Sequence, residues 1–258
     1  MKKTALITGA TAGIGARFAQ LLAKEDFDLV LVARDETRLN EVAGILIKEY
    51  GIGCEVLRAD LSTDSGCELI EERLSRTAEP VEVLINNAGF GLRESFLTSS
   101  LADEVQLFDV LCRTPMRLMH AVLPSMQQRN KGIIINVSSV AGWIAGGSYS
   151  AAKSYLTVLS ESLHTNLQGT QVHVIALCPG FTRTEFHERG KMNMRGLPSF
   201  MWLSADTVVA QAWADAHAGK AISIPGKQYQ VISAILRYGP RPLVRRVGMK
   251  VRSHRRKK

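Results

Sequence analysis

The regular alternation of short apolar runs with longer segments of helical periodicity is the feature that most constrains this fold. Several apolar runs contain almost no polar residue, which is typical of strands that are covered on both faces. Strands are predicted over residues 4–9, 28–34, 54–60, 81–89, 132–139, 171–180 and 221–226. Helical periodicity lies between them, over residues 13–24, 36–49, 101–129 and 148–168. The alternation predicts an α/β fold, a doubly wound parallel sheet of about seven strands with helices on both faces.

Charge is distributed unevenly along the chain. Nine of the 32 Lys and Arg residues, and none of the 24 Asp and Glu residues, lie in 241–258. The net charge of +8 therefore belongs to this segment, and the rest of the chain is close to neutral. We predict one domain over residues 1–226, followed by a C-terminal helix and a polybasic tail over 227–258.

The segment before the tail has apolar residues on one helical face: Val231, Ile232, Ile235 and Leu236. An apolar helix that leads into a polybasic end is typical of a peripheral anchor for anionic lipid. A disordered, solubilising tail fits the same pattern. The tail has no interleaved aromatics and no nucleic-acid motif, so we expect no nucleic acid partner. No apolar stretch reaches about eighteen residues, so we expect a cytoplasmic protein. The apolar helix and basic tail add peripheral contact with the inner membrane surface as a second expectation.

Four cysteines are scattered through the chain without the spacing of metal ligands: Cys54, Cys67, Cys112 and Cys178. This pattern predicts reduced thiols and no metal site.

A glycine-rich turn, TGATAGIG, follows the first predicted strand and opens the first predicted helix. Gly9, Gly13 and Gly15 allow a tight turn and let a phosphate approach the backbone, while the helix N-terminus supplies N–H groups and a positive dipole. A glycine-rich turn without a ligand is the alternative. The strand, turn and helix context favours a dinucleotide site.

Arg34 comes just after the second predicted strand, where chains of this architecture meet the adenosine ribose. An acid there would bind a 2′-hydroxyl, whereas a guanidinium suits a 2′-phosphate because it pairs with phosphate in a bidentate way. Asp35 lies beside it and leaves the acidic alternative open. We expect NADP(H).

Three further motifs follow later strands. NNAG ends at Gly89, NVSS ends at Ser139, and SYSAAKS holds Tyr149 and Lys153 four residues apart. Residues at this spacing share one helix face, so the phenol and the ammonium can reach one ligand. Each motif alone fits an ordinary turn or a solvated helix.

The order TGxxxGxG, NNAG, Ser, YxxxK and PG resembles the short-chain dehydrogenase/reductase family in its single-domain form, from residue 4 to about residue 226. The resemblance implies a Rossmann-type fold and NADP(H) as the cofactor. It implies cofactor contacts from Gly9, Thr11, Gly13, Ile14, Gly15, Arg34, Asp60, Leu61, Asn87, Ala88, Gly89, Tyr149, Lys153, Pro179, Gly180, Phe181 and Thr184.

The resemblance also implies a catalytic set of Ser139, Tyr149 and Lys153. Ser139 would hydrogen-bond the substrate carbonyl, and Tyr149 would be the general acid for reduction. Lys153 would bind the nicotinamide ribose and lower the pKa of Tyr149. A free phenol has a pKa of roughly 10, and nearby positive charge brings it closer to the operating pH.

The sequence departs from the family pattern in two places. Only ten residues separate Ser139 from Tyr149, which predicts a shortened loop within VAGWIAGG and leaves Ser138 as a competitor for the serine role. Leu111 stands where many members carry an asparagine that completes a proton relay. Either the relay is built differently, or turnover is slow, or catalysis has been lost.

Two functions therefore remain as predictions. The favoured one is NADPH-dependent reduction of a carbonyl to a hydroxyl on a hydrophobic, lipid-like keto substrate, by a homodimer or homotetramer. The apolar segment 181–204, with Met192, Met194, Phe200, Met201 and Trp202, motivates the substrate class, although these side chains could equally cover core. The alternative is a cofactor-binding protein of the same fold with little catalysis, in a sensor or assembly role.

Overall fold

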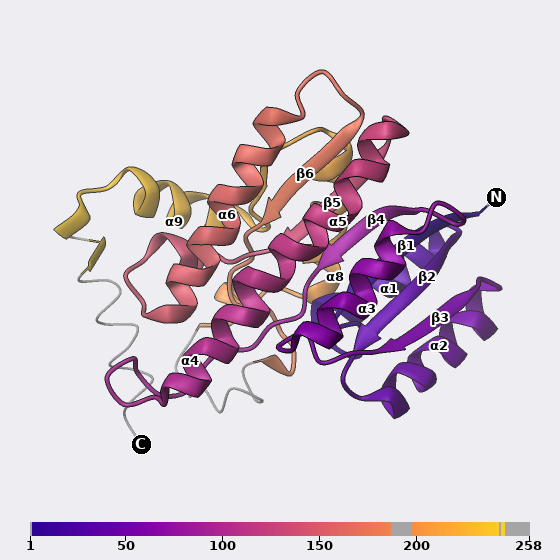
Figure 1. Cartoon of the computed structure of the whole chain (residues 1–258). Coiled ribbons are helices and arrows are strands. Elements are labelled where there is room, and N and C mark those ends of the chain that lie inside the picture. The colour runs from indigo at the N-terminus through magenta and orange to yellow at the C-terminus, as the bar shows by residue number, and fades with distance from the viewer. Residues whose placement is uncertain (1, 187–197, 243, 246–258) are drawn as a thin grey trace.

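The computed structural model describes residues 2–186, 198–242 and 244–245 (Figure 1). A parallel sheet of seven strands runs through its centre, in the order β3-β2-β1-β4-β5-β6-β7. The strands are β1 Lys3–Thr8, β2 Phe27–Ala33, β3 Cys54–Arg58, β4 Val81–Asn86, β5 Gly132–Val137, β6 Val172–Leu177 and β7 Ile222–Ser223. The predicted doubly wound α/β fold is confirmed. The seventh strand is shorter than expected, because only two of its residues pair with β6.

Helices cover both faces of the sheet. The longer ones are α1 Gly13–Lys24, α2 Glu36–Tyr50, α3 Asp64–Ser75, α4 Leu101–Phe108, α5 Thr114–Gln128, α6 Ser148–Asn166, α8 Ala205–His217 and α9 Lys227–Tyr238. Short turns of helix cover Asp109–Arg113 (η1), Val140–Trp143 (η2) and Ser199–Met201 (η3). Apolar side chains of α1, α2 and α8 pack on one face of the sheet, and those of α3, α5 and α6 pack on the other.

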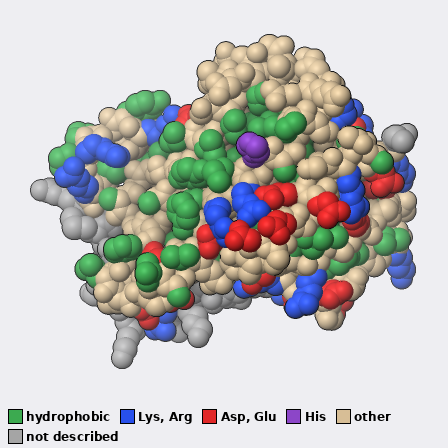
Figure 2. All heavy atoms as spheres, viewed as in Figure 1, with side chains coloured by type: hydrophobic (Ala, Val, Ile, Leu, Met, Phe, Trp, Pro, Cys, Tyr) green, Lys and Arg blue, Asp and Glu red, His purple; other side chains and the backbone are tan. Residues whose placement is uncertain are grey.

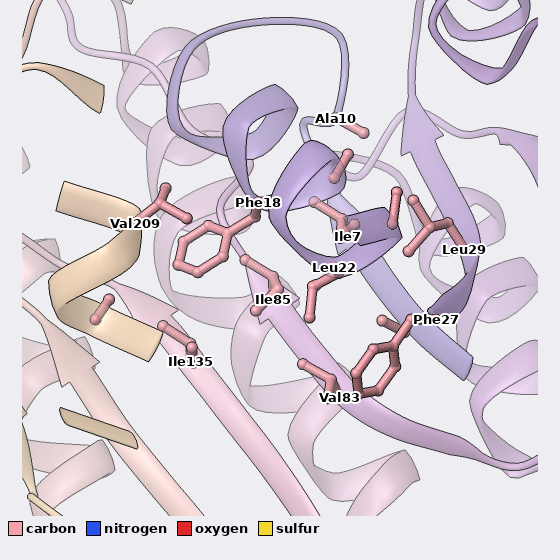
Figure 3. Packing of buried hydrophobic residues seen from close by; sticks show 14 of the residues in the cluster. Ile7, Ala10, Phe18, Leu22, Phe27, Leu29, Val83, Ile85, Ile135 and Val209 are labelled. Atoms are coloured by element: carbon pink, nitrogen blue, oxygen red, sulfur yellow. The ribbon is translucent and has the colours of Figure 1, made fainter. Parts of the chain in front are cut away.

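The core on the first face is built around α1. Phe18 and Leu22 of that helix point toward Ile7 and Ile85 of the sheet, and Val209 of α8 lies beside them (Figure 3). All five side chains are almost fully buried. Because α1 begins at the glycine-rich turn, this packing fixes where that turn sits relative to the sheet.

The single helix predicted over 101–129 is interrupted. Residues Asp109–Arg113 form a π-helical turn between α4 and α5. Pro115 follows at the start of α5 and has no N–H, so it cannot donate to the carbonyl of Leu111 four residues earlier. The helix widens where that hydrogen bond is missing, and π-turns of this kind are frequent at functional sites.

Helix α9 packs into the main core, although the sequence pattern suggested only an apolar face. Tyr229 and Leu236 are buried, whereas Val231 and Ile235 of the predicted apolar face remain exposed. In the described part of the chain, no helix combines the length and the apolar character that crossing a bilayer requires. The polybasic residues beyond Arg245 lie outside the described residues, so membrane contact stays a prediction.

An apolar surface lies between α4 and α6. Val105, Phe108 and Tyr155 are exposed beside a pocket of about 400 Å³. Figure 2 shows hydrophobic side chains on the face of the molecule toward the viewer, next to charged ones. The structure describes one chain, so the expected homo-oligomer stays a prediction.

A threonine at the end of β1 joins the first half of the sheet to the second. Thr8 Oγ1 accepts hydrogen bonds from the backbone N–H groups of Asn87, at 2.9 Å, and Ala88, at 3.0 Å. The same hydroxyl donates to the Ile85 carbonyl, at 3.2 Å. The loop after β1 is therefore held directly against the loop after β4.

We predict that Thr8→Val destabilises the protein by about 3 kcal/mol, because two backbone N–H groups lose their acceptor. Urea unfolding measures the change. Thr4→Val is the matched control: Thr4 lies on the same strand, is similarly buried, and has no side-chain hydrogen bond within the described residues. Equal losses from the two variants would contradict the prediction.

Candidate active site

The candidate site lies where the strand order reverses. The chain builds β1, β2 and β3 outward in one direction and then returns to place β4 on the other side of β1. The carboxyl ends of parallel strands meet at one edge of a sheet, and a ligand crevice is expected at this reversal. The motifs found in the sequence all follow the carboxyl ends of β1, β2, β4, β5 and β6.

The glycine-rich turn has the shape of a phosphate cradle. Gly9 and Gly13 have φ values of +68° and +57°, a region that disfavours side chains. Gly15 has no room for one, because a Cβ atom would lie 2.3 Å from the Gly9 carbonyl oxygen. Helix α1 begins here without a side-chain cap, so its first N–H groups can receive a phosphate. Thr11 and Ile14 are half-buried beside this turn.

An exposed guanidinium follows the end of β2. Arg34 is exposed and makes no hydrogen bond or close ion pair within the described residues, although its charge acts on Asp60. The Asp35 carboxylate instead caps α2 by accepting the backbone N–H of Arg38, at 3.1 Å. The acidic alternative that the sequence left open is therefore weakened, because that carboxylate is already used by the helix.

Asp60, after β3, is held by its own loop. Its Oδ1 atom accepts hydrogen bonds from the backbone N–H and the hydroxyl of Ser62, at 3.0 and 2.8 Å. Burial raises the pKa of the Asp60 carboxyl, but these hydrogen bonds and the nearby Arg34 outweigh that effect and lower the pKa. The next residue, Leu61, is buried.

The NNAG turn after β4 packs against the glycine-rich turn. The Asn87 side-chain amide donates to the carbonyls of Thr8, at 2.9 Å, and Gly9, at 3.1 Å. Gly89 lies against Leu111. A Cβ atom added to Gly89 would be 2.8 Å from Leu111 Cδ2 and 3.9 Å from Lys153 Nζ. Leu111 is buried on the same side of Gly89 as Lys153, and its place at the family's relay position stays a prediction.

The two serines after β5 have different environments. Ser138 is almost fully buried, and its hydroxyl bonds to the Lys153 carbonyl, at 2.8 Å, and to the Thr157 hydroxyl, at 2.7 Å. Ser139 is half-buried and accepts the backbone N–H of Ala141, at 3.1 Å, at the start of η2. Ser138 is committed to α6, so Ser139 is the serine that remains accessible at the strand end.

Helix α6 brings Tyr149 and Lys153 to the same edge. Lys153 is 5% exposed, and its Nζ atom donates to the Val137 carbonyl, at 2.6 Å. Nζ lies 5.7 Å from the centre of the Tyr149 ring. Burial lowers the pKa of the Lys153 ammonium to about 8. The Tyr149 ring packs against an apolar cluster made by Leu107, Leu111, Cys112 and Ala152.

The segment after β6 crosses the crevice. Thr184 lies against Gly13. A Cβ atom added to Gly13 would be 3.1 Å from the Cβ atom of Thr184. Phe186 contacts Tyr149, with ring centres 5.9 Å apart. Pro179 and Gly180 precede this segment, and their contact with the nicotinamide stays a prediction. Of the predicted apolar flap, Met192 and Met194 lie outside the described residues, Phe200 is exposed, and Met201 and Trp202 are half-buried.

Tyr229 is a residue that sequence reasoning missed. Its ring fills the space beside Gly180, where a Cβ atom would lie 2.0 Å from the ring. Its hydroxyl accepts the Phe181 N–H, at 3.0 Å, and donates to the Met201 carbonyl, at 2.6 Å. One buried phenol thus ties together the two ends of the segment between Phe181 and Met201. No motif marks this tyrosine, since it lies in what looks like an ordinary amphipathic helix.

These residues together offer a glycine-rich turn with free helix N–H groups, an exposed guanidinium after β2, a phenol near a buried ammonium, and a serine hydroxyl at the end of β5. The arrangement suits a dinucleotide laid along the sheet edge and proton transfer from the Tyr149 phenol.

Comparison with known proteins agrees with this geometry. Residues 3–194 match the family described as short chain dehydrogenase. The ketoacyl reductase HetN of Nostoc sp. is 34% identical over 182 residues, which cover 69% of this chain and 63% of that protein. A very-long-chain 3-oxoacyl-CoA reductase from Anas platyrhynchos is 31% identical over 217 residues, 81% of this chain and 67% of that protein. The chain therefore spans about two thirds of the length of these relatives.

Among solved structures, a short-chain dehydrogenase from Sphingobium yanoikuyae in complex with NADPH is similar to this chain. The sequences are 33% identical, and the TM-score is 0.84. The match covers 91% of this chain and 92% of the other.

We predict that the contribution of Lys153 to stability depends on pH. Its pKa falls from 10.5 to about 8 on folding, so between these values the unfolded chain holds a proton that the folded chain has lost. The unfolding free energy therefore rises with pH across this window, by about 3 kcal/mol in total. Below pH 8 both states carry the charge, and the burial penalty is present in full.

The measurement is urea unfolding of the cofactor-free protein and of Lys153→Met between pH 7 and 10.5. We expect the unfolding free energy of wild type to rise relative to that of Lys153→Met as pH increases. The other titrating groups contribute equally to both proteins and cancel in the difference. Lys24→Met, at an exposed site on α1, is the matched control. A difference between wild type and Lys153→Met that stays constant with pH would contradict the prediction.

We also predict that Tyr229→Phe destabilises the protein by about 1–2 kcal/mol, since the buried hydroxyl makes two hydrogen bonds to backbone groups. Tyr238→Phe, on the same helix but 81% exposed, is the control and should change little. Thermal unfolding compares the two variants. A Tyr229→Phe protein as stable as wild type would show that the hydroxyl does not anchor the segment.

Proposed function

Because the chain belongs to the short-chain dehydrogenase/reductase family, we propose that it is an NADPH-dependent reductase that converts a carbonyl to a hydroxyl on a hydrophobic keto substrate. The observation that carries the proposal is the buried Lys153 ammonium, placed under the Tyr149 ring at the carboxyl edge of the sheet. A buried ammonium with a lowered pKa beside a crevice is typical of a functional site.

NADP(H) fits the residues along the crevice. Gly9, Gly13 and Gly15 form a tight turn that no side chain could enter, and α1 begins at this turn without a side-chain cap, so its first N–H groups are available to a pyrophosphate. Arg34 is exposed and makes no hydrogen bond or close ion pair within the described residues, and Asp35 is engaged as a helix cap. A guanidinium in this position favours a 2′-phosphate over a 2′-hydroxyl. The similar Sphingobium protein is in complex with NADPH.

The chain's own residues handle the proton and the orientation of the substrate. The reduced cofactor, when bound, supplies a hydride to the carbonyl carbon. Tyr149 gives its hydroxyl proton to the carbonyl oxygen, which becomes the alcohol, and Ser139 holds that oxygen by a hydrogen bond. Lys153 places a positive charge near the phenol and so stabilises the phenolate that remains. Val137 holds the ammonium in place through its carbonyl.

The side chains around Tyr149 favour an apolar substrate. Leu111, Phe90 and Leu92 belong to its apolar cluster, and Phe186 contacts its ring. Phe181 and Trp202 pack together farther along the segment after β6, with ring centres 6.0 Å apart. The names of two relatives, a ketoacyl reductase and a very-long-chain 3-oxoacyl-CoA reductase, support a β-keto acyl compound as the substrate class.

Leu111 motivates the second candidate, a protein of this fold that binds the cofactor and catalyses little. A leucine side chain cannot hold the water of a proton relay, and here it is buried beside Gly89. The two candidates make the same prediction for cofactor binding and opposite predictions for turnover.

We predict NADPH oxidation, followed by absorbance, with ketones graded by chain length, and faster turnover on long-chain than on small polar ketones. NADH should be the poorer cofactor. Tyr149→Phe should abolish turnover, by about 10³-fold or more, since it removes the general acid. The same variant should bind NADPH normally, which separates loss of chemistry from loss of binding. NADPH binding without turnover of any ketone would favour the second candidate, and activity confined to small polar ketones would contradict the substrate class.

A further inference from the structure

Three consecutive residues after β6 each contact a different part of the proposed site. Thr184 lies against Gly13 of the glycine-rich turn. Glu185 pairs with Arg38 in the first turn of α2. Phe186 contacts the ring of Tyr149. We call Thr184, Glu185 and Phe186 the strap, because this short segment connects the cofactor end of the crevice with the catalytic end.

The pair between Arg38 and Glu185 joins residues 147 positions apart. The two terminal nitrogens of the guanidinium donate to the two carboxylate oxygens, at 3.0 and 3.3 Å. Both side chains are about 40% exposed, so water and solutes reach them. A bidentate pair of this kind is specific in geometry but weak in free energy at such exposure.

Arg38 lies close to the arginine expected to bind the 2′-phosphate. Arg34 follows β2, Asp35 caps α2 by accepting the Arg38 N–H, and Arg38 lies in the first helical turn. The guanidinium of Arg38 pairs with Glu185, and the residue before Glu185, Thr184, lies against Gly13, so the strap links Arg38 to the glycine-rich turn. The adenosine ribose of a dinucleotide passes through this region in sheets of this kind.

We propose that Arg38 is a second ligand for the 2′-phosphate of NADP(H), and that Glu185 competes with the phosphate for it. The proposal rests on the proposed function, since it assumes a cofactor in the crevice. The Arg38 guanidinium faces the carboxylate with its bidentate edge. A phosphate would bind the same edge. Arrival of the phosphate exchanges one anion for another and detaches the strap from α2.

Glu185 is then a determinant of cofactor choice rather than a simple tether. It lowers the affinity for a cofactor with a 2′-phosphate, both by occupying Arg38 and by repelling the second anion. It leaves the affinity for a cofactor without that phosphate almost unchanged. A merely structural ion pair would act differently, because loss of such a pair would shift the binding of both cofactors together.

The test is a binding titration of the full chain by calorimetry, with four ligands: NADPH, NADH, 2′,5′-ADP and 5′-AMP. The variants are Glu185→Gln, Arg38→Gln and the double variant. Glu41→Gln is the matched control, because Glu41 lies on α2 near Arg38 and acts on it only through its charge, without a hydrogen bond. No readout depends on turnover.

We expect Glu185→Gln to lower the dissociation constants of NADPH and 2′,5′-ADP roughly fivefold, the size of an exposed ion pair, with NADH and 5′-AMP unchanged. Arg38→Gln should raise the first two constants roughly tenfold. In the Arg38→Gln background, Glu185→Gln should give a clearly smaller gain than in wild type, since only the direct repulsion between the carboxylate and the phosphate is then relieved. Glu41→Gln should change little.

Two results overturn the proposal: a Glu185→Gln protein that binds all four ligands as wild type does, or one in which NADPH and NADH shift equally. Both differ from failure of the proposed function. If wild type binds neither NADPH nor NADH, the cofactor assignment is wrong, and the proposed role of Glu185 is then wrong as well. If wild type binds NADPH and the variant shows no selective gain, only the role of Glu185 is wrong.

Discussion

The candidate site depends on the junction between β1 and β4, where the chain reverses the direction in which it builds the sheet. Thr8 accepts N–H groups from the loop after β4, and Asn87 returns two hydrogen bonds to the loop after β1. Each loop therefore supplies the hydrogen bonds that the other lacks. A parallel sheet alone brings strand ends together only approximately, and this exchange sets the glycine-rich turn and the NNAG turn in fixed contact. The arrangement explains why both motifs occur in one chain.

The motifs with a local physical cause could be predicted from the sequence. Gly9 and Gly13 need positive φ, Gly15 admits no Cβ, and Tyr149 and Lys153 share a helix face because they are four residues apart. The seven strands were likewise evident, because parallel strands covered on both faces read as apolar runs. In these cases the residue type and its near neighbours were sufficient.

Features that depend on contacts between distant segments could not be predicted. Tyr229 meets Gly180 from a helix almost fifty residues later, and nothing in YQVISAIL distinguishes it from other core residues. Glu185 finds Arg38 across 147 residues. The π-turn at Asp109–Arg113 had a local signal, since Pro115 removes one helical hydrogen bond, but helical periodicity continued through it and predicted one long helix.

The energetics of Lys153 help to decide between an active enzyme and a protein of this fold that has lost its catalysis. The ammonium is buried, its pKa is lowered to about 8, and it donates to a neutral carbonyl rather than to a carboxylate. Burying a charge without a charged partner is unfavourable, and an apolar side chain of similar size would remove the penalty. Positions that work against stability in this way are concentrated at functional sites. Leu111 argues for reduced catalysis, but a leucine at a buried helix position has no cost in stability. A buried Lys153 lowers stability, so its presence calls for a functional reason. The buried ammonium therefore favours a chain that still performs the proton transfer.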